Sequence, residues 1–174
     1  IYKRDDTAMQ CSSLDDDKVA WGSYAGVALY SHMTSAYSGG MFVWTGWDYL
    51  GEPTPFNRYP AKSSYFGIVD LAGFPKDIYS MYQSRWTREP MIHIVPVDWD
   101  NWTTVETVKV YLYTNCEKME LVLNGVSVGT KTKYQMDDRY RYAFDVAYAA
   151  GTLTAKGYNA GGEVVAVNEV KTST

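Results

Sequence analysis

Residues 39–55 read Gly-Gly-Met-Phe-Val-Trp-Thr-Gly-Trp-Asp-Tyr-Leu-Gly-Glu-Pro-Thr-Pro, and this stretch decides how the first half of the chain is interpreted. Within it, residues 41–44 form a short apolar run directly after a glycine pair. Such a run is typical of a strand buried on both faces in a parallel sheet. Residues 45–75, which follow, are rich in Gly, Pro, Ser, Tyr and Asp. A connection of that length predicts a functional loop at the C-terminal end of the strand.

Helical periodicity flanks the predicted strand on both sides. In residues 21–37 apolar side chains recur every three or four positions, which predicts a helix that ends at Gly39-Gly40. A second helix is predicted from Asp77, which can cap its start, to Glu89-Pro90, which closes it. Helix, strand, loop and helix make an α/β unit, but one parallel strand buries little without neighbours. Residues 1–90 therefore resemble part of a larger α/β domain.

The periodicity changes from helical to alternating after Pro90. Apolar residues alternate with polar ones in several short segments, and Asn124-Gly125 is a strong signal for a two-residue hairpin. Glycine-containing turns separate further alternating segments at 140–146, 152–158 and 164–170. About seven short strands at this spacing predict an immunoglobulin-like β-sandwich. The fold class is therefore α/β plus all-β, with domains at residues 1–90 and 91–174.

Composition excludes several classes of protein. The 174 residues carry 16 Lys plus Arg and 20 Asp plus Glu, a net charge of −4. The chain has no basic run longer than two residues, which argues against a nucleic-acid partner. The apolar runs are far shorter than the roughly 20 residues of a membrane span. His32 and His93 lack partners at metal-ligand spacing, so no metal and no cofactor is predicted. The sequence predicts a soluble protein and leaves its location open, with the bacterial periplasm or secretion as compatible sites.

The quoted stretch resembles the last barrel strand and following loop of glycoside hydrolase family 2, the family of β-galactosidases and β-glucuronidases. The resemblance rests on the Trp-Thr-Gly-x-Asp-Tyr-x-Gly-Glu-Pro run at 44–53 and continues through 63–70 and 73–77. Residues 113–116 and 120–125 are similar to the immunoglobulin-like domain that follows the barrel in that family. The resemblance implies the terminal portion of a (β/α)8 TIM barrel in residues 1–90, followed by the β-sandwich.

The resemblance also implies a function for the intact enzyme, the retaining hydrolysis of terminal β-galactosides. Retention needs two carboxyl groups about 5 to 5.5 Å apart. In the family these come from earlier barrel strands, and residue 1 resembles a position just after the seventh. The Asn168-Glu169 pair lies in a predicted sandwich strand, where alternation exposes Glu169. We therefore expect no catalytic residue in this chain, no activity from the chain alone, and the missing N-terminal part of the enzyme as its partner.

Size leads to the same expectation, since a complete barrel takes about 250 residues and a sandwich about 100. Residues 1–90 would then be roughly two of eight barrel units. We expect them to expose an apolar patch larger than the few hundred Å² usual for monomers, because the strands that would cover it are absent.

Three residues are predicted to bind the carbohydrate substrate. Trp44 ends the apolar run, where the family places an aromatic platform, and an indole can cover the apolar face of a pyranose; the structural alternative is barrel core. Asp48 matches an acidic position of the family and could accept hydrogen bonds from sugar hydroxyls or, equally, from the amides of its own loop. Trp47 is expected as a subsite wall or as loop packing. Glu52 is interpreted as structural, and Lys76 as a support for the loop.

Two alternative functions are kept. One is a β-glucuronidase of the same family, which would need a cationic clamp for the uronate carboxylate that the sequence does not identify. The other is a noncatalytic carbohydrate-binding or scaffolding module built on residues 91–174. Its candidate binding face would be made of sandwich tyrosines, although cross-strand packing also explains them. Those tyrosines are Tyr111, Tyr113, Tyr140, Tyr142 and Tyr158.

Overall fold

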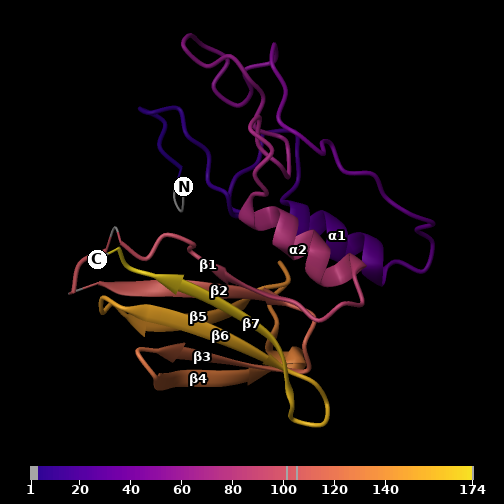
Figure 1. Ribbon diagram of the computed structural model, residues 1–174. Helices are drawn as coiled ribbons and strands as arrows, with labels where there is room; N and C mark the ends of the chain where they lie inside the picture. The colour runs from indigo at the N-terminus through magenta and orange to yellow at the C-terminus, as the bar shows by residue number, and fades with distance from the viewer. Residues whose placement is uncertain (1–3, 101, 105, 174) are drawn as a thin grey trace. The chain divides into compact units, whose positions relative to one another are not determined.

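The computed structural model describes residues 4–100, 102–104 and 106–173 (Figure 1). Its described elements, in chain order, are α1 (Ala25–Thr34), α2 (Asp77–Trp86), β1 (Ile92–Val95), β2 (Thr107–Thr114), β3 (Lys118–Leu123), β4 (Val126–Thr132), the 3-10 turn η1 (Lys133–Gln135), β5 (Tyr142–Ala147), β6 (Thr152–Tyr158) and β7 (Val164–Lys171). The chain forms two compact units that divide after Ser80, inside α2. Both helices lie where the sequence predicts helices.

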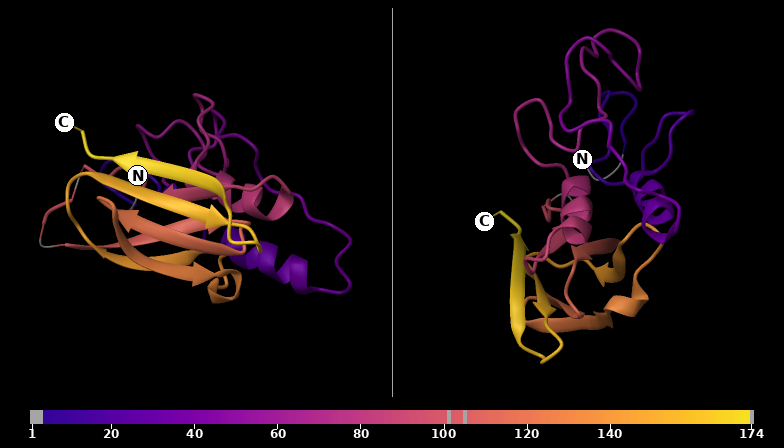
Figure 2. Two further views of the ribbon diagram at one scale, coloured as in Figure 1. Left: turned by 60° about the horizontal axis from the view of Figure 1, so that its bottom comes forward. Right: turned by 90° about the vertical axis from the view of Figure 1, so that its right-hand side faces the viewer.

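The second unit is a β-sandwich, as predicted for this part of the chain. One sheet has the strand order β1-β2-β5 and the other β4-β3-β6-β7, and all pairings are antiparallel. Figure 2 shows the two sheets as separate layers. Asn124 and Gly125 both have positive φ, at 50° and 83°, which a type I′ hairpin turn between β3 and β4 requires. The predicted hairpin is therefore confirmed.

Alternating side chains from both sheets build the core of the sandwich. On β2 Val108, Val110 and Leu112 are buried and the residues between them are not, because successive side chains of a strand point to opposite faces. Trp99 is completely buried and donates its indole N–H to the Ala149 carbonyl at 3.1 Å, so its one polar atom keeps a partner. The buried cluster consists of Ile92, Ile94, Trp99, Val108, Val110, Leu112, Met119, Leu121, Tyr142, Phe144, Val146, Leu153 and Ala155.

The last turns of α2 belong to the sandwich unit rather than to the region before it. Arg85 donates to the Thr114 carbonyl at the end of β2, and its guanidinium lies 5.3 Å from the centre of the Tyr140 ring. Burial lowers the pKa of this guanidinium from its ordinary value. These contacts place the division between the units inside the helix, whereas the periodicity of the sequence changes at Pro90.

The first unit is built mostly of loops. The N-terminus of its helix α1 is capped by a side chain that lies about ten residues earlier in the sequence. The carboxylate of Asp15 accepts the backbone N–H of Ala25 at 2.6 Å and that of Gly26 at 2.7 Å. These are amides of the first turn, which have no partner within a helix, and a negative charge there also suits the helix dipole. Asp15 therefore fixes where α1 begins, four residues after the predicted start of the helix.

The predicted strand at residues 41–44 is wrong for this structure. These residues form no strand, and Phe42 and Trp44 are exposed rather than buried. A parallel strand takes its hydrogen bonds from neighbouring strands, and the described residues supply no strand on either side of it. The next residues along the chain, 45–48, instead exchange backbone hydrogen bonds with residues 66–69.

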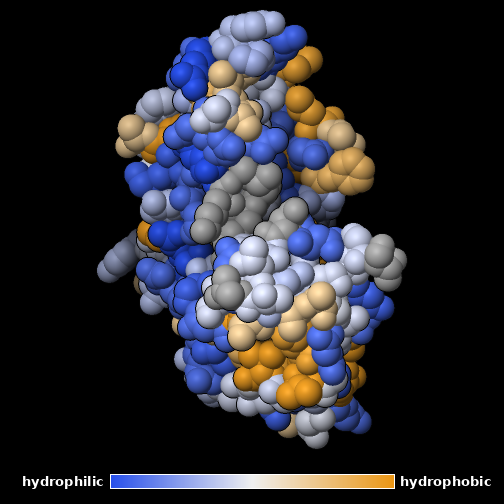
Figure 3. All heavy atoms as spheres, turned by 90° about the vertical axis from the view of Figure 1, so that its left-hand side faces the viewer, coloured by the Kyte–Doolittle hydropathy of each residue, from blue (hydrophilic) through white to orange (hydrophobic). Residues whose placement is uncertain are grey.

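Many large apolar side chains of the first unit are exposed. The single apolar patch larger than a few hundred Å² stays a prediction. Among the described residues up to Ser80, Leu14 and Leu29 are the buried large hydrophobic side chains. Figure 3 shows apolar side chains at several places on the surface of this unit. The exposed ones are Trp21, Tyr30, Met33, Tyr37, Phe42, Trp44, Trp47, Leu50, Tyr59, Leu71, Phe74 and Tyr79. In the part of the chain that the structure describes, neither helix has the length and apolar character to cross a membrane.

The tight contact between Gly157 and Cys116 gives a test of the sandwich. A Cβ at Gly157 would lie 2.5 Å from the Cys116 sulfur and 3.2 Å from its Cβ. We expect Gly157→Ala to lower the free energy of unfolding by about 1 to 3 kcal/mol, measured by urea denaturation. Adding Cys116→Ala should recover part of this loss, because it removes the sulfur.

Gly129 on β4 is the matched control for this substitution. A Cβ there would meet the Phe144 ring at an ordinary 3.8 Å. Gly129→Ala should therefore change stability by less than about 0.5 kcal/mol. Equal stability of the two alanine variants would contradict the packing described.

Candidate functional site

The three residues predicted to bind sugar lie on one short segment with very different exposure. Trp44 and Trp47 are 75% and 64% exposed, whereas Asp48 is 7% exposed. The two indoles are thus open to a ligand, while the carboxylate points into the loop structure. The platform role of Trp44 stays a prediction, and the sequence could not separate the two roles of Asp48.

The Asp48 carboxylate joins three segments of the first unit. Its Oδ1 accepts the backbone N–H of Gly67 at 2.8 Å and the ammonium of Lys76 at 2.8 Å. Lys76 also donates to the Tyr65 carbonyl at 3.3 Å, and its ammonium lies 6.0 Å from the centre of the Tyr65 ring. The side chains of Asp48 and Lys76 are 5% and 16% exposed, so this ion pair is largely shielded from water. We call Asp48, Gly67 and Lys76 the aspartate clamp.

Close backbone contact surrounds the aspartate clamp. Asp48 donates its own N–H to the Val69 carbonyl at 2.9 Å, and Val69 donates to the Gly46 carbonyl at 3.0 Å. A Cβ on Gly67 would lie only 2.1 Å from the Asp48 nitrogen, so glycine is the residue that fits there. Asp48 therefore accepts from an amide of its own loop, which is the structural role considered above. Its contact with sugar hydroxyls stays a prediction.

A second chain of contacts runs along the surface from Trp44. The indole N–H of Trp44 donates to the Tyr49 hydroxyl oxygen at 3.4 Å, and the Tyr49 hydroxyl donates to the Glu52 carboxylate. The two rings meet edge to face, with centroids 6.1 Å apart and planes at 83°. The hydrogen bond to Glu52 raises the pKa of the Tyr49 phenol above its ordinary value, because it stabilises the protonated form. Sequence reasoning did not single out Tyr49.

Asp48 and Glu52 therefore do not act as a pair. Asp48 is bound to Lys76 and Glu52 accepts from Tyr49, so each carboxylate has a different partner. This agrees with the structural interpretation of Glu52 and with Lys76 as a support of the loop. Among the described residues, no group of three His, Cys, Asp or Glu side chains is placed to hold a metal ion.

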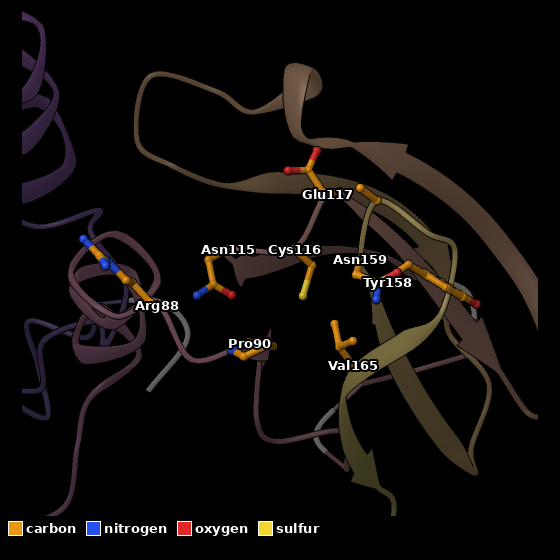
Figure 4. Close-up of a pocket in the computed structure, with 9 residues that line it drawn as sticks. Arg88, Pro90, Asn115, Cys116, Glu117, Tyr158, Asn159 and Val165 are labelled. Carbon is orange, nitrogen blue, oxygen red and sulfur yellow. The ribbon is translucent and has the colours of Figure 1, made fainter.

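A pocket of about 260 Å³ lies at one end of the sandwich (Figure 4). The amide of Asn115 accepts from Met91 and donates to the Glu89 carbonyl, so its hydrogen-bonding capacity is used within the protein. In Figure 4 the Arg88 side chain extends away from Cys116, which faces the hollow. The pocket therefore presents few free polar groups to a ligand. Its lining consists of Arg88, Pro90, Asn115, Cys116, Glu117, Tyr158, Asn159, Ala160 and Val165.

The tyrosines of the sandwich do not form one exposed platform. Tyr113, Tyr140 and Tyr142 are buried, with at most 5% exposure. Tyr111 has the Arg141 guanidinium 4.4 Å from its ring centre. Tyr158 donates to the Glu120 carboxylate at 2.7 Å. Packing within the protein thus accounts for these side chains, and the structure gives no support to a sugar-binding face made of them.

Comparison with known proteins identifies relatives for almost the whole chain. The β-galactosidase BoGH2A of Bacteroides ovatus is 41% identical over 169 residues, which are 97% of this chain and 19% of that protein. The crystal structure of a β-glycosidase from Bacteroides vulgatus superimposes with a TM-score of 0.83 at 32% identity, covering 97% of this chain and 20% of the other. The chain thus spans about a fifth of the length of these relatives.

Two further matches are shorter. A β-glucuronidase from glycoside hydrolase family 2 matches with a TM-score of 0.57 at 26% identity, over 64% of this chain and 11% of that one. The family described as "Domain of unknown function (DUF4982)" matches residues 105–166. The relatives are glycosidases of one family. The chain is a homologue of glycoside hydrolase family 2 enzymes and matches a C-terminal portion of them.

The aspartate clamp can be tested by Asp48→Asn. An asparagine oxygen can still accept from Gly67, but the Lys76 ammonium loses its negative partner in a shielded site. We expect the stability of the first unit to fall by about 3 kcal/mol. Faster hydrogen exchange of the Gly67 amide, measured by NMR or mass spectrometry, should report the loss locally.

Lys109→Met is the control for this substitution, because Lys109 pairs with Asp145 at 2.7 Å with both side chains about half exposed or more. Removing an exposed pair should cost less than about 1 kcal/mol. An Asp48→Asn variant no less stable than the Lys109→Met variant would refute the structural importance of the clamp.

Proposed function

We propose that this chain is part of a retaining glycoside hydrolase that acts on terminal β-galactosides. It would contribute to the sugar-binding site but not the catalytic carboxylates. The observation that carries this proposal is the 41% identity to a β-galactosidase over 97% of the chain. The exposed indole of Trp44 at the edge of an ordered loop supplies a fitting surface for a sugar ring.

In this proposal the two units have different tasks. The first unit, with α1, the start of α2 and exposed apolar side chains, would be the end of a TIM barrel whose other strands cover that surface and leave Trp44 and Trp47 open to the sugar. The second unit would be an immunoglobulin-like accessory domain. Seven described strands in antiparallel sheets of three and four support this assignment. The missing N-terminal part of the enzyme would supply the acid/base and the nucleophile.

The chemistry assigned to this chain is substrate binding. Trp44 would cover the apolar C–H face of the terminal galactose, which removes apolar surface from water while leaving the hydroxyls free to hydrogen-bond. Trp47, also exposed, would form a wall beside it. The aspartate clamp would hold the loop that carries both indoles, and in the assembled site Asp48 would also accept from a sugar hydroxyl.

A β-glucuronidase is the second candidate, since several relatives are described as β-glucuronidases. A uronate would need a free cation near the platform. Lys76 is already paired with Asp48 and is not free for this role. Because the relative that matches 97% of this chain is named a β-galactosidase, we favour the galactoside, and initial rates of the intact enzyme on matched aryl β-galactoside and aryl β-glucuronide substrates separate the two. Faster hydrolysis of the glucuronide would overturn our choice of sugar.

The role of Trp44 predicts a loss of activity in the intact enzyme. Trp44→Ala should lower kcat/KM on an aryl β-galactoside roughly 10- to 100-fold, because the apolar face of the sugar loses its cover. Trp44→Phe should retain part of the activity, since a smaller ring still covers part of the sugar. Unchanged kcat/KM in the alanine variant would remove Trp44 from the site.

An assay of the isolated 174-residue chain tests whether the chain contributes sugar binding without the catalytic carboxylates. We expect no hydrolysis of aryl β-galactoside above the buffer blank, because the two catalytic carboxylates lie in the missing part. The intact enzyme under the same conditions is the control. Substantial turnover by the isolated chain, retained after chromatography, would contradict the proposal.

A further inference from the structure

We propose that Tyr49 is a positioning residue that fixes the orientation of the Trp44 indole, with Glu52 orienting the Tyr49 hydroxyl. The inference rests on the proposed function, in which Trp44 is the sugar platform. It adds a residue that does not itself touch the sugar but determines how the platform is presented.

Among the described residues, little besides Tyr49 restrains the Trp44 ring. Three quarters of its surface is exposed, so packing of the described residues does not select one orientation of the ring. Tyr49 provides two directional restraints, an edge-to-face contact with planes at 83° and an acceptor for the indole N–H at 3.4 Å. Together they limit rotation of the indole about its bond to Cβ and leave its faces open.

Glu52 determines which way the Tyr49 hydroxyl proton points. Because the Tyr49 hydroxyl donates its single proton to the Glu52 carboxylate, the oxygen lone pairs remain available to the Trp44 N–H. Hydrogen bonds in such a chain polarise one another, so the bond to Glu52 strengthens the acceptor that Trp44 uses. Without Glu52 the hydroxyl could rotate and present its proton toward the indole edge.

The backbone of Tyr49 is itself well anchored. Its N–H donates to the Ser64 side-chain oxygen at 3.2 Å, and its carbonyl accepts the Ser64 N–H at 2.8 Å. Ser64 is fully buried, and Tyr49 directly follows the buried Asp48. The support thus extends from a fixed, shielded part of the loop to an exposed indole. This is the arrangement that a positioning residue requires.

The proposal predicts non-additive kinetics in the intact enzyme. Tyr49→Phe keeps the ring and removes the hydroxyl, and we expect kcat/KM on an aryl β-galactoside to fall about tenfold. In a Trp44→Phe background, which lacks the indole N–H, Tyr49→Phe should have no further effect. Glu52→Gln should lower kcat/KM less than Tyr49→Phe does, and its effect should also vanish in the Trp44→Phe background.

Tyr59→Phe is the matched control, since Tyr59 lies in the same loop with 85% exposure. It should leave kcat/KM unchanged. A melting temperature equal to that of the parent enzyme shows that a variant is folded. Glu52→Gln tests the same hydrogen-bond chain while leaving the tyrosine intact. A merely structural role of Tyr49 would lower kcat/KM equally in both backgrounds.

The outcomes separate this proposal from the one on which it rests. If Trp44→Ala leaves kcat/KM unchanged, the sugar platform is wrong and the positioning role falls with it. If Trp44→Ala reduces kcat/KM but Tyr49→Phe has no effect, or the same effect in both backgrounds, the platform stands and the positioning role of Tyr49 is overturned. If Tyr49→Phe lowers kcat/KM in the parent enzyme but not in the Trp44→Phe background, both the sugar platform and the positioning role of Tyr49 are supported.

Discussion

The carboxylate of Asp48 is the group on which the loop region of the first unit depends. That unit has no sheet and a small buried core in its described residues, so apolar packing alone does not define it. One shielded carboxylate instead binds an amide from one segment and an ammonium from another. Removing such charges from water is costly, and the arrangement is favourable only when both partners are in place. The absence of a side chain at Gly67 is part of the same constraint.

The sandwich is stabilised in a different way. Its strands alternate between buried and exposed residues, and both sheets turn their apolar faces into one core. Such a core depends on many weak contacts rather than on one ion pair. The exposed indoles lie in the loops of the first unit. In our proposal, Tyr49 makes the exposed Trp44 a more precise binding surface than it would be alone.

Much of the fold follows from periodicity in the sequence. Both helices, the sandwich and the Asn124-Gly125 turn were predicted because each depends on local spacing or on a local backbone conformation. The strand prediction at residues 41–44 was wrong because the described residues supply no neighbouring strand for it, although its composition suits a buried strand. For the site, the sequence predicted a supporting role for Lys76, which its contact with Asp48 bears out. The contact of Tyr49 with Trp44 was missed because it depends on the orientation of a hydroxyl group.

The sequence by itself determined the family resemblance, and it predicted both helices and the β-sandwich. These properties depend on which residue types occur and at what spacing. Only the tertiary structure decided that Asp48 faces Gly67 and Lys76, which lie 19 and 28 residues away along the chain. The tertiary structure also decided that Glu52 accepts a hydrogen bond from Tyr49 and does not pair with Asp48. Hydrogen bonds are short and directional, so the choice between nearby partners is made by the folded backbone and not by spacing in the sequence.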